Sequence, residues 1–175
     1  MNPHIREANV ADLNALLDLV HSAYRGDSAR RGWTHEADFL DGQRTDAAEL
    51  TAILDDPKQR LLVAEARDGL AGCVQIADKG VGTAYLGMLS INPARQAQGL
   101  GRVLIAAAES GAKDAFGAGR IEMTVIRQRE ELIAYYERRG YARTGEERPF
   151  PLDDPRFGIP KRQDLSFVVL AKSLS

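Results

Sequence analysis

Apolar residues recur at helical spacing in the first part of the chain. In the first such segment they stand three or four positions apart: Leu13, Leu16, Leu17, Val20 and Tyr24. This spacing places them on one face of a helix, which predicts an amphipathic helix that packs on a core. Asn9 and Asp12 resemble the capping pair that opens a helix. A second short helix is predicted over residues 46–54, and Asp55-Asp56-Pro57 ends it because proline disfavours helical geometry before it.

Short apolar runs predict extended segments at the start and in the middle of the chain. Residues 5–8 are the first. Residues 61–66 and 70–77 follow, and the Arg67-Asp68-Gly69 sequence between them is typical of a hairpin turn. Residues 83–91 form a further run that ends at Asn92-Pro93. The middle of the chain is therefore predicted to be an antiparallel meander.

Helices and strands alternate in the second half of the chain. The spacing of apolar residues predicts helices over residues 98–116 and 130–139. Strands are predicted over residues 121–126, from residue 141 onward and over residues 165–171. Antiparallel strands followed by a strand, helix, strand and helix indicate a mixed α/β (α+β) fold.

Two long connections lack this periodicity. Residues 25–45 combine glycines, Trp33 and charges of both signs, and residues 149–160 hold four of the seven prolines. Connections of this length without regular structure are often functional.

Composition narrows the class of protein. The 175 residues fit one domain, here taken as 1–175. Lys plus Arg number 23 against 25 Asp plus Glu, which gives a net charge of −2. A near-neutral balance disfavours nucleic acid and anionic membrane as partners, because both require a basic surface.

The few cysteines and histidines point to a reducing compartment and no metal. Cys73 is the only cysteine, so no intramolecular disulfide can form, and we expect it to be a small buried hydrophobe. His4, His21 and His35 show no ligand spacing. The start of the sequence lacks a signal peptide's apolar core and no run is long enough to span a membrane. We therefore expect a cytoplasmic protein without a metal.

The informative junction lies between the strand over 83–91 and the helix that follows it. The turn there is Gln96-Ala97-Gln98-Gly99-Leu100-Gly101. Glycines allow a ligand close to the backbone, and the unpaired amides of a helix start, with the helix dipole, suit a pyrophosphate. A nucleotide P-loop would need Lys and Ser or Thr after Gly101, where Arg102 and Val103 stand. A dinucleotide fingerprint would need a small residue at Leu104 and a position early in the chain.

Three segments together resemble the GNAT N-acetyltransferase superfamily. The turn matches that superfamily's acetyl-CoA motif, Gln/Arg-x-x-Gly-x-Gly/Ala, residues 85–93 resemble its central strand, and residues 134–141 resemble its Tyr-x-x-x-Gly-Phe signature. Two signatures in the right order are more specific than a pair of glycines alone. The resemblance implies the GNAT fold, a central mostly antiparallel mixed sheet flanked by helices.

The resemblance also implies a reaction and a cofactor site. An amine attacks the thioester of acetyl-CoA directly and the CoA thiolate leaves. The residues expected to hold acetyl-CoA, mainly through their backbone, are Leu89, Ser90, Ile91, Gln96, Ala97, Gln98, Gly99, Leu100, Gly101 and Arg102. Tyr136, four residues before Gly140, matches the tyrosine that protonates the thiolate in many relatives, with Tyr135 as the less favoured neighbour.

Two positions depart from the family pattern. Tyr85 stands where the histone acetyltransferase branch has a glutamate, which weakens a histone-tail substrate and leaves Glu122, Glu36 or a water relay as the base. Arg129 stands where many relatives have an asparagine near the cofactor. Cofactor contacts from the helix over 130–139 are therefore open.

Substrate choice in this superfamily usually depends on the two connections already described. Trp33, Glu36 and Arg44 combine an aromatic wall with both charge signs and are the expected acceptor-binding residues; a solvated loop anchored by Trp33 is the alternative. The sequence thus predicts acetyl transfer to a primary amine of a small molecule or of a protein N-terminus. The alternative is a non-catalytic acyl-CoA-binding regulatory domain. Relatives often form homodimers, so a homodimer is left open.

Overall fold

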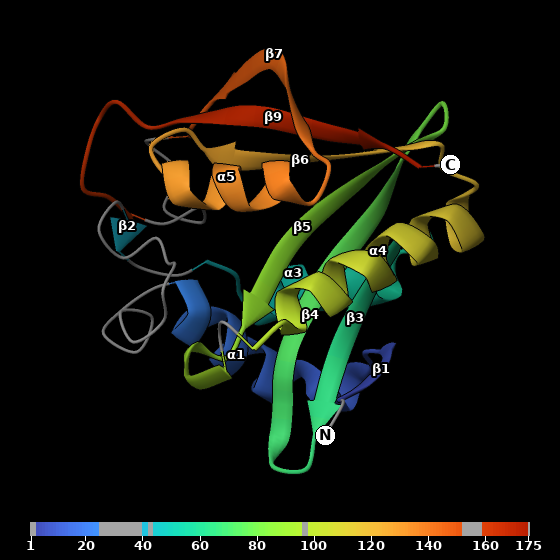
Figure 1. The fold of residues 1–175 in the computed structure, drawn as a ribbon. Coiled ribbons are helices and arrows are strands. Elements are labelled where there is room, and N and C mark those ends of the chain that lie inside the picture. The colour runs from blue at the N-terminus through green and yellow to red at the C-terminus, as the bar shows by residue number, and fades with distance from the viewer. Residues whose placement is uncertain (1–2, 25–39, 42–43, 96–97, 152–158, 175) are drawn as a thin grey trace.

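The computed structural model describes residues 3–24, 40–41, 44–95, 98–151 and 159–174 (Figure 1). Its strands are β1 (His4–Glu7), β2 (Leu40–Asp41), β3 (Gln59–Ala66), β4 (Gly69–Gly80), β5 (Thr83–Ile91), β6 (Arg120–Ile126), β7 (Ala142–Pro149), β8 (Ile159–Pro160) and β9 (Ser166–Ser173). Its α-helices are α1 (Leu13–Tyr24), α3 (Ala47–Asp55), α4 (Leu100–Phe116) and α5 (Glu130–Arg138), with 3-10 turns η1 (Val10–Asp12) and η2 (Pro93–Arg95). The helices and strands predicted outside the two long connections are confirmed, with small shifts at their ends.

Seven strands form one sheet in the order β1-β3-β4-β5-β6-β9-β7. Every neighbouring pair is antiparallel except β5 and β6, which run parallel. The predicted mostly antiparallel mixed sheet is therefore confirmed. β2 and β8, which the sequence did not predict, form a separate two-stranded ladder that joins the two long connections, pairing Leu40 with Pro160 and Asp41 with Ile159.

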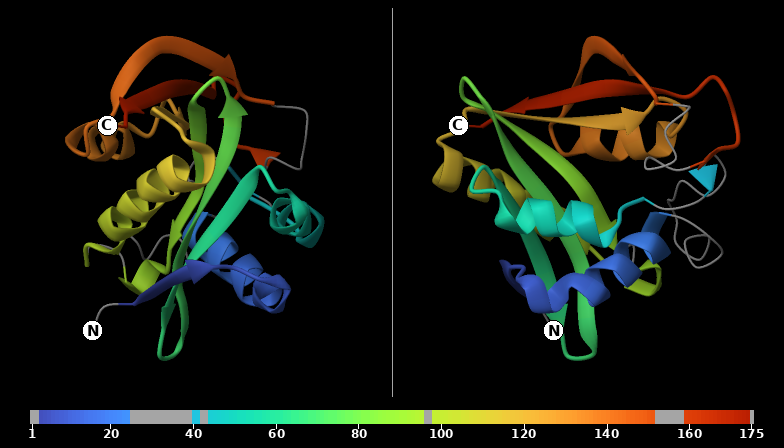
Figure 2. Two further views of the ribbon diagram at one scale, coloured as in Figure 1. Left: turned by 90° about the vertical axis from the view of Figure 1, so that its right-hand side faces the viewer. Right: turned by 180° about the vertical axis from the view of Figure 1, so that it is seen from behind.

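Helices cover both faces of the sheet, α4 and α5 on one and α1 and α3 on the other (Figure 2). Residues of β5 are buried in both layers, because a bulge shifts the alternation of its side chains between Leu86 and Met88. Ala84 and Leu86 are buried with Leu104 of α4, whereas Met88, beyond an irregularity in the strand, is buried with Leu16 of α1. We call the side of α4 and α5 the front face and the side of α1 and α3 the back face.

Local sequence signals position the helices. The side chain of Asn9 accepts from Ala11 N while Asp12 accepts from Asn9 N, so the predicted capping pair is present at η1. Asp46 accepts from Glu49 N at the start of α3. Gly117 ends α4 in the left-handed conformation, with φ 63°.

No helix among the described residues is long and apolar enough to cross a membrane.

Candidate active site

The sheet divides between β5 and β6. Their parallel pairing covers only Thr83–Tyr85 against Arg120–Glu122 within the part of the chain that the structure describes. From Tyr85 onward the two strands diverge, as Figure 1 shows. β5 keeps β4 as its neighbour as far as Ile91, and β6 keeps β9 as far as Ile126. Each arm of the resulting V is therefore held by its own antiparallel partner.

A bulge interrupts β5 within the diverging part. Gln75 pairs with Gly87 and Cys73 with Ser90, so two residues of β5, Met88 and Leu89, face a single residue of β4. Met88 has φ 52°, an uncommon value for a residue with a side chain. Its carbonyl oxygen accepts from Ser90 Oγ at 3.1 Å and from Cys73 Sγ at 3.6 Å. These contacts fix the direction of the backbone just before the glycine turn.

The glycine turn follows β5 and η2 and opens α4. Gly99 is the N-cap residue with φ 81°, a conformation that favours glycine. Helical geometry leaves the amides of Leu100, Gly101 and Arg102 without an intrahelical acceptor, and the helix dipole adds partial positive charge there. This end of α4 can therefore bind an anionic group such as a pyrophosphate.

Tyr135 of α5 closes on the glycine turn. A Cβ atom built on Gly101 would lie 2.6 Å from Tyr135 Oη, so the glycine leaves the space that the phenol occupies. The guanidinium of Arg139 lies over the Tyr135 ring, 4.3 Å from its centroid. The side chain of Tyr135 thus brings α5 against the first turn of α4.

Tyr136 points away from the direction of Tyr135, because successive helical residues are about 100° apart. Its side chain lies in the front core. Its ring is 5% exposed and makes edge-to-face contacts with Tyr135 at 5.6 Å and with Tyr141 at 6.0 Å between ring centroids. Tyr141 donates to Glu109 at 2.9 Å. Burial, together with the Glu109 charge, raises the pKa of Tyr141, so that phenol stays neutral.

A cavity of about 610 Å³ lies on the back face of the sheet, beside the point where β5 and β6 separate. Its charged lining residues are Asp56, Lys58, Asp78, Lys79 and Arg148. The remaining lining residues include Tyr85, Thr124, Phe167 and Ala77. Tyr85 and Thr124 come from the two arms of the V, and Tyr85 Oη lies 2.8 Å from Thr124 Oγ1. The cavity and the glycine turn therefore lie on opposite faces of the V.

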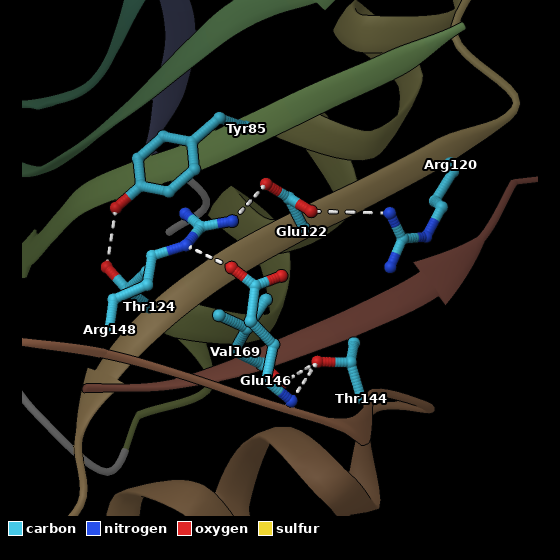
Figure 3. Close-up of polar contacts among 8 residues, drawn as sticks. All are labelled: Tyr85, Arg120, Glu122, Thr124, Thr144, Glu146, Arg148 and Val169. Carbon is cyan, nitrogen blue, oxygen red and sulfur yellow. Dashed lines mark hydrogen bonds and ion pairs between the residues drawn. The ribbon is translucent and has the colours of Figure 1, made fainter.

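A network of ion pairs borders this cavity (Figure 3). Glu122, which is buried, accepts from Arg120 at 3.3 Å and from Arg148 at 3.2 Å. Arg148 Nε also donates to Glu146 at 2.7 Å. These hydrogen bonds raise the pKa of Arg148 and lower that of Glu146. Both oxygens of Glu122 are engaged by guanidinium groups, which leaves this carboxylate poorly placed to take a proton from an amine.

The described residues among the predicted cofactor-binding residues lie at the end of β5 and at the start of α4. Leu89, Ser90 and Ile91 end β5, and Gln98–Arg102 form the glycine turn and the first turn of α4. Gln96 and Ala97 lie outside the described residues, as do the predicted acceptor residues Trp33 and Glu36.

Arg44 and Cys73 belong to the back-face side of the sheet. Arg44 precedes α3, and its charge reaches Cys73. Burial raises the pKa of the Cys73 thiol to about 12, against smaller opposing effects of Ser90 and Arg44. Cys73 is fully buried among the residues of α1, α3 and β3, as the sequence predicted. A neutral, buried thiol is a poor nucleophile.

Sequence reasoning missed Thr124 and Arg148. Glu122 and Thr124 alternate with the apolar residues Ile121, Met123 and Val125, so a period of two could have placed both polar side chains on one face of the strand. Arg148 lies in a run of charged residues that gives no such signal.

Known proteins share both sequence features and the fold with this chain. The sequence model described as the acetyltransferase (GNAT) family matches residues 14–141, more than half of the chain. No curated protein matches the sequence significantly.

Several solved structures share the fold. The smu.2055 protein of Streptococcus mutans UA159 is similar with a TM-score of 0.74 and 12% identity, over 98% of this chain and 99% of that chain. The ribosomal-protein-S18-alanine N-acetyltransferase of Escherichia coli has a TM-score of 0.71 and 16% identity, over 100% and 95%. The yncA protein of Salmonella typhimurium, solved with its cofactor acetyl-CoA, has a TM-score of 0.72 and 19% identity, over 100% and 95%.

Proposed function

The chain belongs to the acetyltransferase (GNAT) family, and from this premise we propose that it transfers the acetyl group of acetyl-CoA to a primary amine of a small molecule. The amino terminus of a protein is the second class of acceptor. The yncA structure, which contains acetyl-CoA, supports the choice of acyl donor.

The observation that carries the proposal is the V between β5 and β6 with different chemistry on its two faces. The front face offers the glycine turn and the positive end of α4. The back face offers a cavity lined by Tyr85 and Thr124. A thioester whose pyrophosphate lies at α4 would enter the V from the front, and an amine in the cavity would meet it from behind. Direct attack requires the amine nitrogen and the thioester carbon to be held at contact distance, which this placement allows.

The chain's own residues fit the cofactor at the turn. Gly99 supplies the left-handed conformation that opens α4, and Gly101 lets the Tyr135 hydroxyl lie against the first turn, where it can meet a phosphate beside the unpaired amides. Acetyl-CoA, when bound, supplies an activated acyl carbon and a thiolate leaving group. Replacing Gly101 with Glu would put a bulky anion into this space, and we expect that change to abolish binding.

We assign the proton for the leaving thiolate to Tyr136. A neutral phenol can donate its proton to a developing thiolate. Tyr136 lies in the same buried cluster as Leu104 of α4 and Val125 of β6, which is on the front face of the V. Tyr135, in contrast, has its hydroxyl at Gly101, where the pyrophosphate is expected. That position favours a binding role for Tyr135.

The base that takes the amine proton is most simply a water molecule in the back-face cavity or Glu36. Glu122 was the third candidate, and its two engaged oxygens argue against it. This assignment is part of the proposal.

An amine screen tests the proposed function. Purified protein is mixed with acetyl-CoA and a panel of small primary amines and N-terminal peptides, and free CoA is measured with a disulfide reagent. The only cysteine is buried, so the protein itself should contribute little signal. Amine-dependent release of CoA supports the proposal. Binding of acetyl-CoA without transfer to any amine would instead favour a regulatory acyl-CoA-binding domain.

A further inference from the structure

We propose that the back-face cavity selects an acceptor amine that also carries a carboxylate, as amino acids do. This inference rests on the proposed function, because it takes the cavity to be the acceptor site. The acceptor that fits depends on which charged groups around the cavity remain available to a ligand. Three cationic and two acidic side chains line it, and their hydrogen bonds differ.

Arg148 is a fixed donor at this cavity. Its Nε donates to Glu146 at 2.7 Å and its Nη2 donates to Glu122 at 3.2 Å. Within the described part of the chain, Nη1 donates to no protein acceptor. Two carboxylates thus orient the guanidinium, and its Nη1 edge remains available to a ligand. A planar guanidinium can donate two parallel hydrogen bonds to a carboxylate. Figure 3 shows the guanidinium between Glu122 and Glu146 on the side of Tyr85.

Lys58 and Lys79 add two ammonium groups at the same cavity. Both residues are exposed, and neither forms an ion pair with a carboxylate of the described residues. Lys79 Nζ lies 5.9 Å from the centroid of the Tyr85 ring, so this ammonium is placed directly beside the V. A ligand anion could therefore form a direct ion pair with either ammonium group.

The acidic residues of the cavity, in contrast, are engaged by the chain itself. Asp56 accepts from Lys58 N at 2.9 Å and from Gln59 Nε2 at 3.0 Å, and Asp78 accepts from Gly80 N at 2.9 Å. These hydrogen bonds lower the pKa of Asp56 and use both of its oxygens. The cavity therefore offers charged donors to a ligand and few free anionic acceptors.

This balance favours one class of acceptor over another. An amine with a carboxylate can place its anion among Arg148, Lys58 and Lys79 while its apolar part contacts Tyr85 and Phe167. A polyamine would bring a second ammonium toward three cations, which disfavours it. The specificity thus follows from both attraction and repulsion.

Matched substrates test the inference. Each amino acid in a panel is compared with its carboxamide and with the corresponding amine that lacks the carboxylate, and kcat/KM is measured at saturating acetyl-CoA. We expect the carboxylate form to be preferred by at least about 10-fold. Arg148→Gln and Lys79→Gln should each reduce that preference several-fold, through KM, with the Kd of acetyl-CoA unchanged.

The variants are chosen so that a folding defect cannot decide the result. Arg148→Gln removes one partner of buried Glu122, whereas Lys79 is exposed and its replacement leaves no group unpaired. Arg143→Gln, on the same strand as Arg148 but outside the cavity lining, is the control and should keep the full preference.

The outcomes separate this inference from the proposed function. Equal kcat/KM for carboxylates and carboxamides overturns the inference and leaves acetyl transfer intact. If no amine is acetylated, calorimetry with the same amino acids decides: binding that Arg148→Gln weakens supports the inference alone, and absence of binding overturns both.

Discussion

Tyr135 and Tyr136 are adjacent in α5, yet their side chains have different surroundings. The Tyr135 hydroxyl lies at the glycine turn, and the Tyr136 ring is buried against Tyr141. The helical rotation between neighbours is the cause. Two adjacent phenols are thereby given distinct expected roles, cofactor binding for Tyr135 and proton donation for Tyr136.

Replacing Tyr136 with Phe should lower kcat by roughly 100-fold or more with little change in the Kd of acetyl-CoA. Phe retains the ring contacts with Tyr141 and loses only the proton donor. The basic limb of the pH profile should move as well. Tyr135→Phe is the matched control and should keep kcat. If Tyr135→Phe loses activity while Tyr136→Phe retains it, the roles are reversed; full activity in both would remove a tyrosine acid from the mechanism.

Replacing Gly101 with Ala should weaken acetyl-CoA binding by roughly 5-fold, because the new Cβ would meet Tyr135 Oη at 2.6 Å and the phenol must move. The next atom, Tyr135 Cζ, is 3.6 Å away, an ordinary contact distance. The effect of Gly101→Ala on the Kd of acetyl-CoA, measured by calorimetry, should therefore be smaller in the Tyr135→Phe background than in the wild type. An identical effect of Gly101→Ala in both backgrounds would rule out the contact with Tyr135.

At this scale the sequence predicts main-chain roles better than side-chain ones. The glycine turn was found because its residue types are required by backbone geometry, at Gly99 above all. Arg148 was not, because its position at the cavity depends on Glu122 and Glu146, one of which is distant in sequence. Met88 was also unpredictable as a site of positive φ, since methionine has no preference for that conformation.

Among the secondary-structure elements, α4 packs closely on the front face of β4. A Cβ atom on Gly72 would lie 2.8 Å from Leu104 Cδ1 and 2.9 Å from the backbone oxygen of Ser90. The absence of a side chain at Gly72 is therefore what lets α4 approach the sheet.

We expect Gly72→Ala to reduce the free energy of unfolding by about 1–3 kcal/mol, the usual cost of overpacking a core. Chemical denaturation followed by circular dichroism measures it. Gly119→Ala is the matched control, because a Cβ there would meet no atom within 4 Å, and it should change stability by less than about 0.5 kcal/mol. Equal stability of Gly72→Ala and wild type would mean that α4 can shift freely on β4.

The junction between β1 and η1 depends on one ion pair. Arg6 donates to both oxygens of Asp12 at 2.9 Å, and Asp12 also accepts from Asn9 N at 2.8 Å. The Arg6 hydrogen bonds hold the pKa of Asp12 below 3.8, its usual value. Because the native pKa is lowered, the stabilisation is fully present above pH 3.8 and is lost as the pH falls through the native pKa.

Asp12→Asn should therefore cost roughly 1 kcal/mol at neutral pH and progressively less as the pH falls below about 4. Denaturation curves of variant and wild type at several pH values measure this difference. Arg6→Gln should flatten the same pH dependence, and the double variant should add little to either single one. A difference that stays constant down to about pH 2 would show that the ion pair is not its source.

Across the whole molecule, the order of the main elements could be predicted from the sequence, but the back-face cavity could not. The sequence indicated the mixed fold because each element has its own apolar period and end signals. It could not indicate that β5 and β6 separate after Tyr85, or that β2 joins β8, since those pairings are set by tertiary contacts. The back-face cavity arises from the first of these features and was missed for the same reason.

The divergence of β5 and β6 also has a consequence for the order of events in turnover. Because the glycine turn and the cavity lie on opposite faces, an acyl donor and an acceptor need not pass one another, and both can be bound at once. The reaction should then show intersecting lines in double-reciprocal plots when one substrate is varied at fixed levels of the other. It should also show no exchange of label between acetyl-CoA and CoA in the absence of an amine. Such kinetics would mean that the enzyme has no need to store the acyl group covalently between two half-reactions.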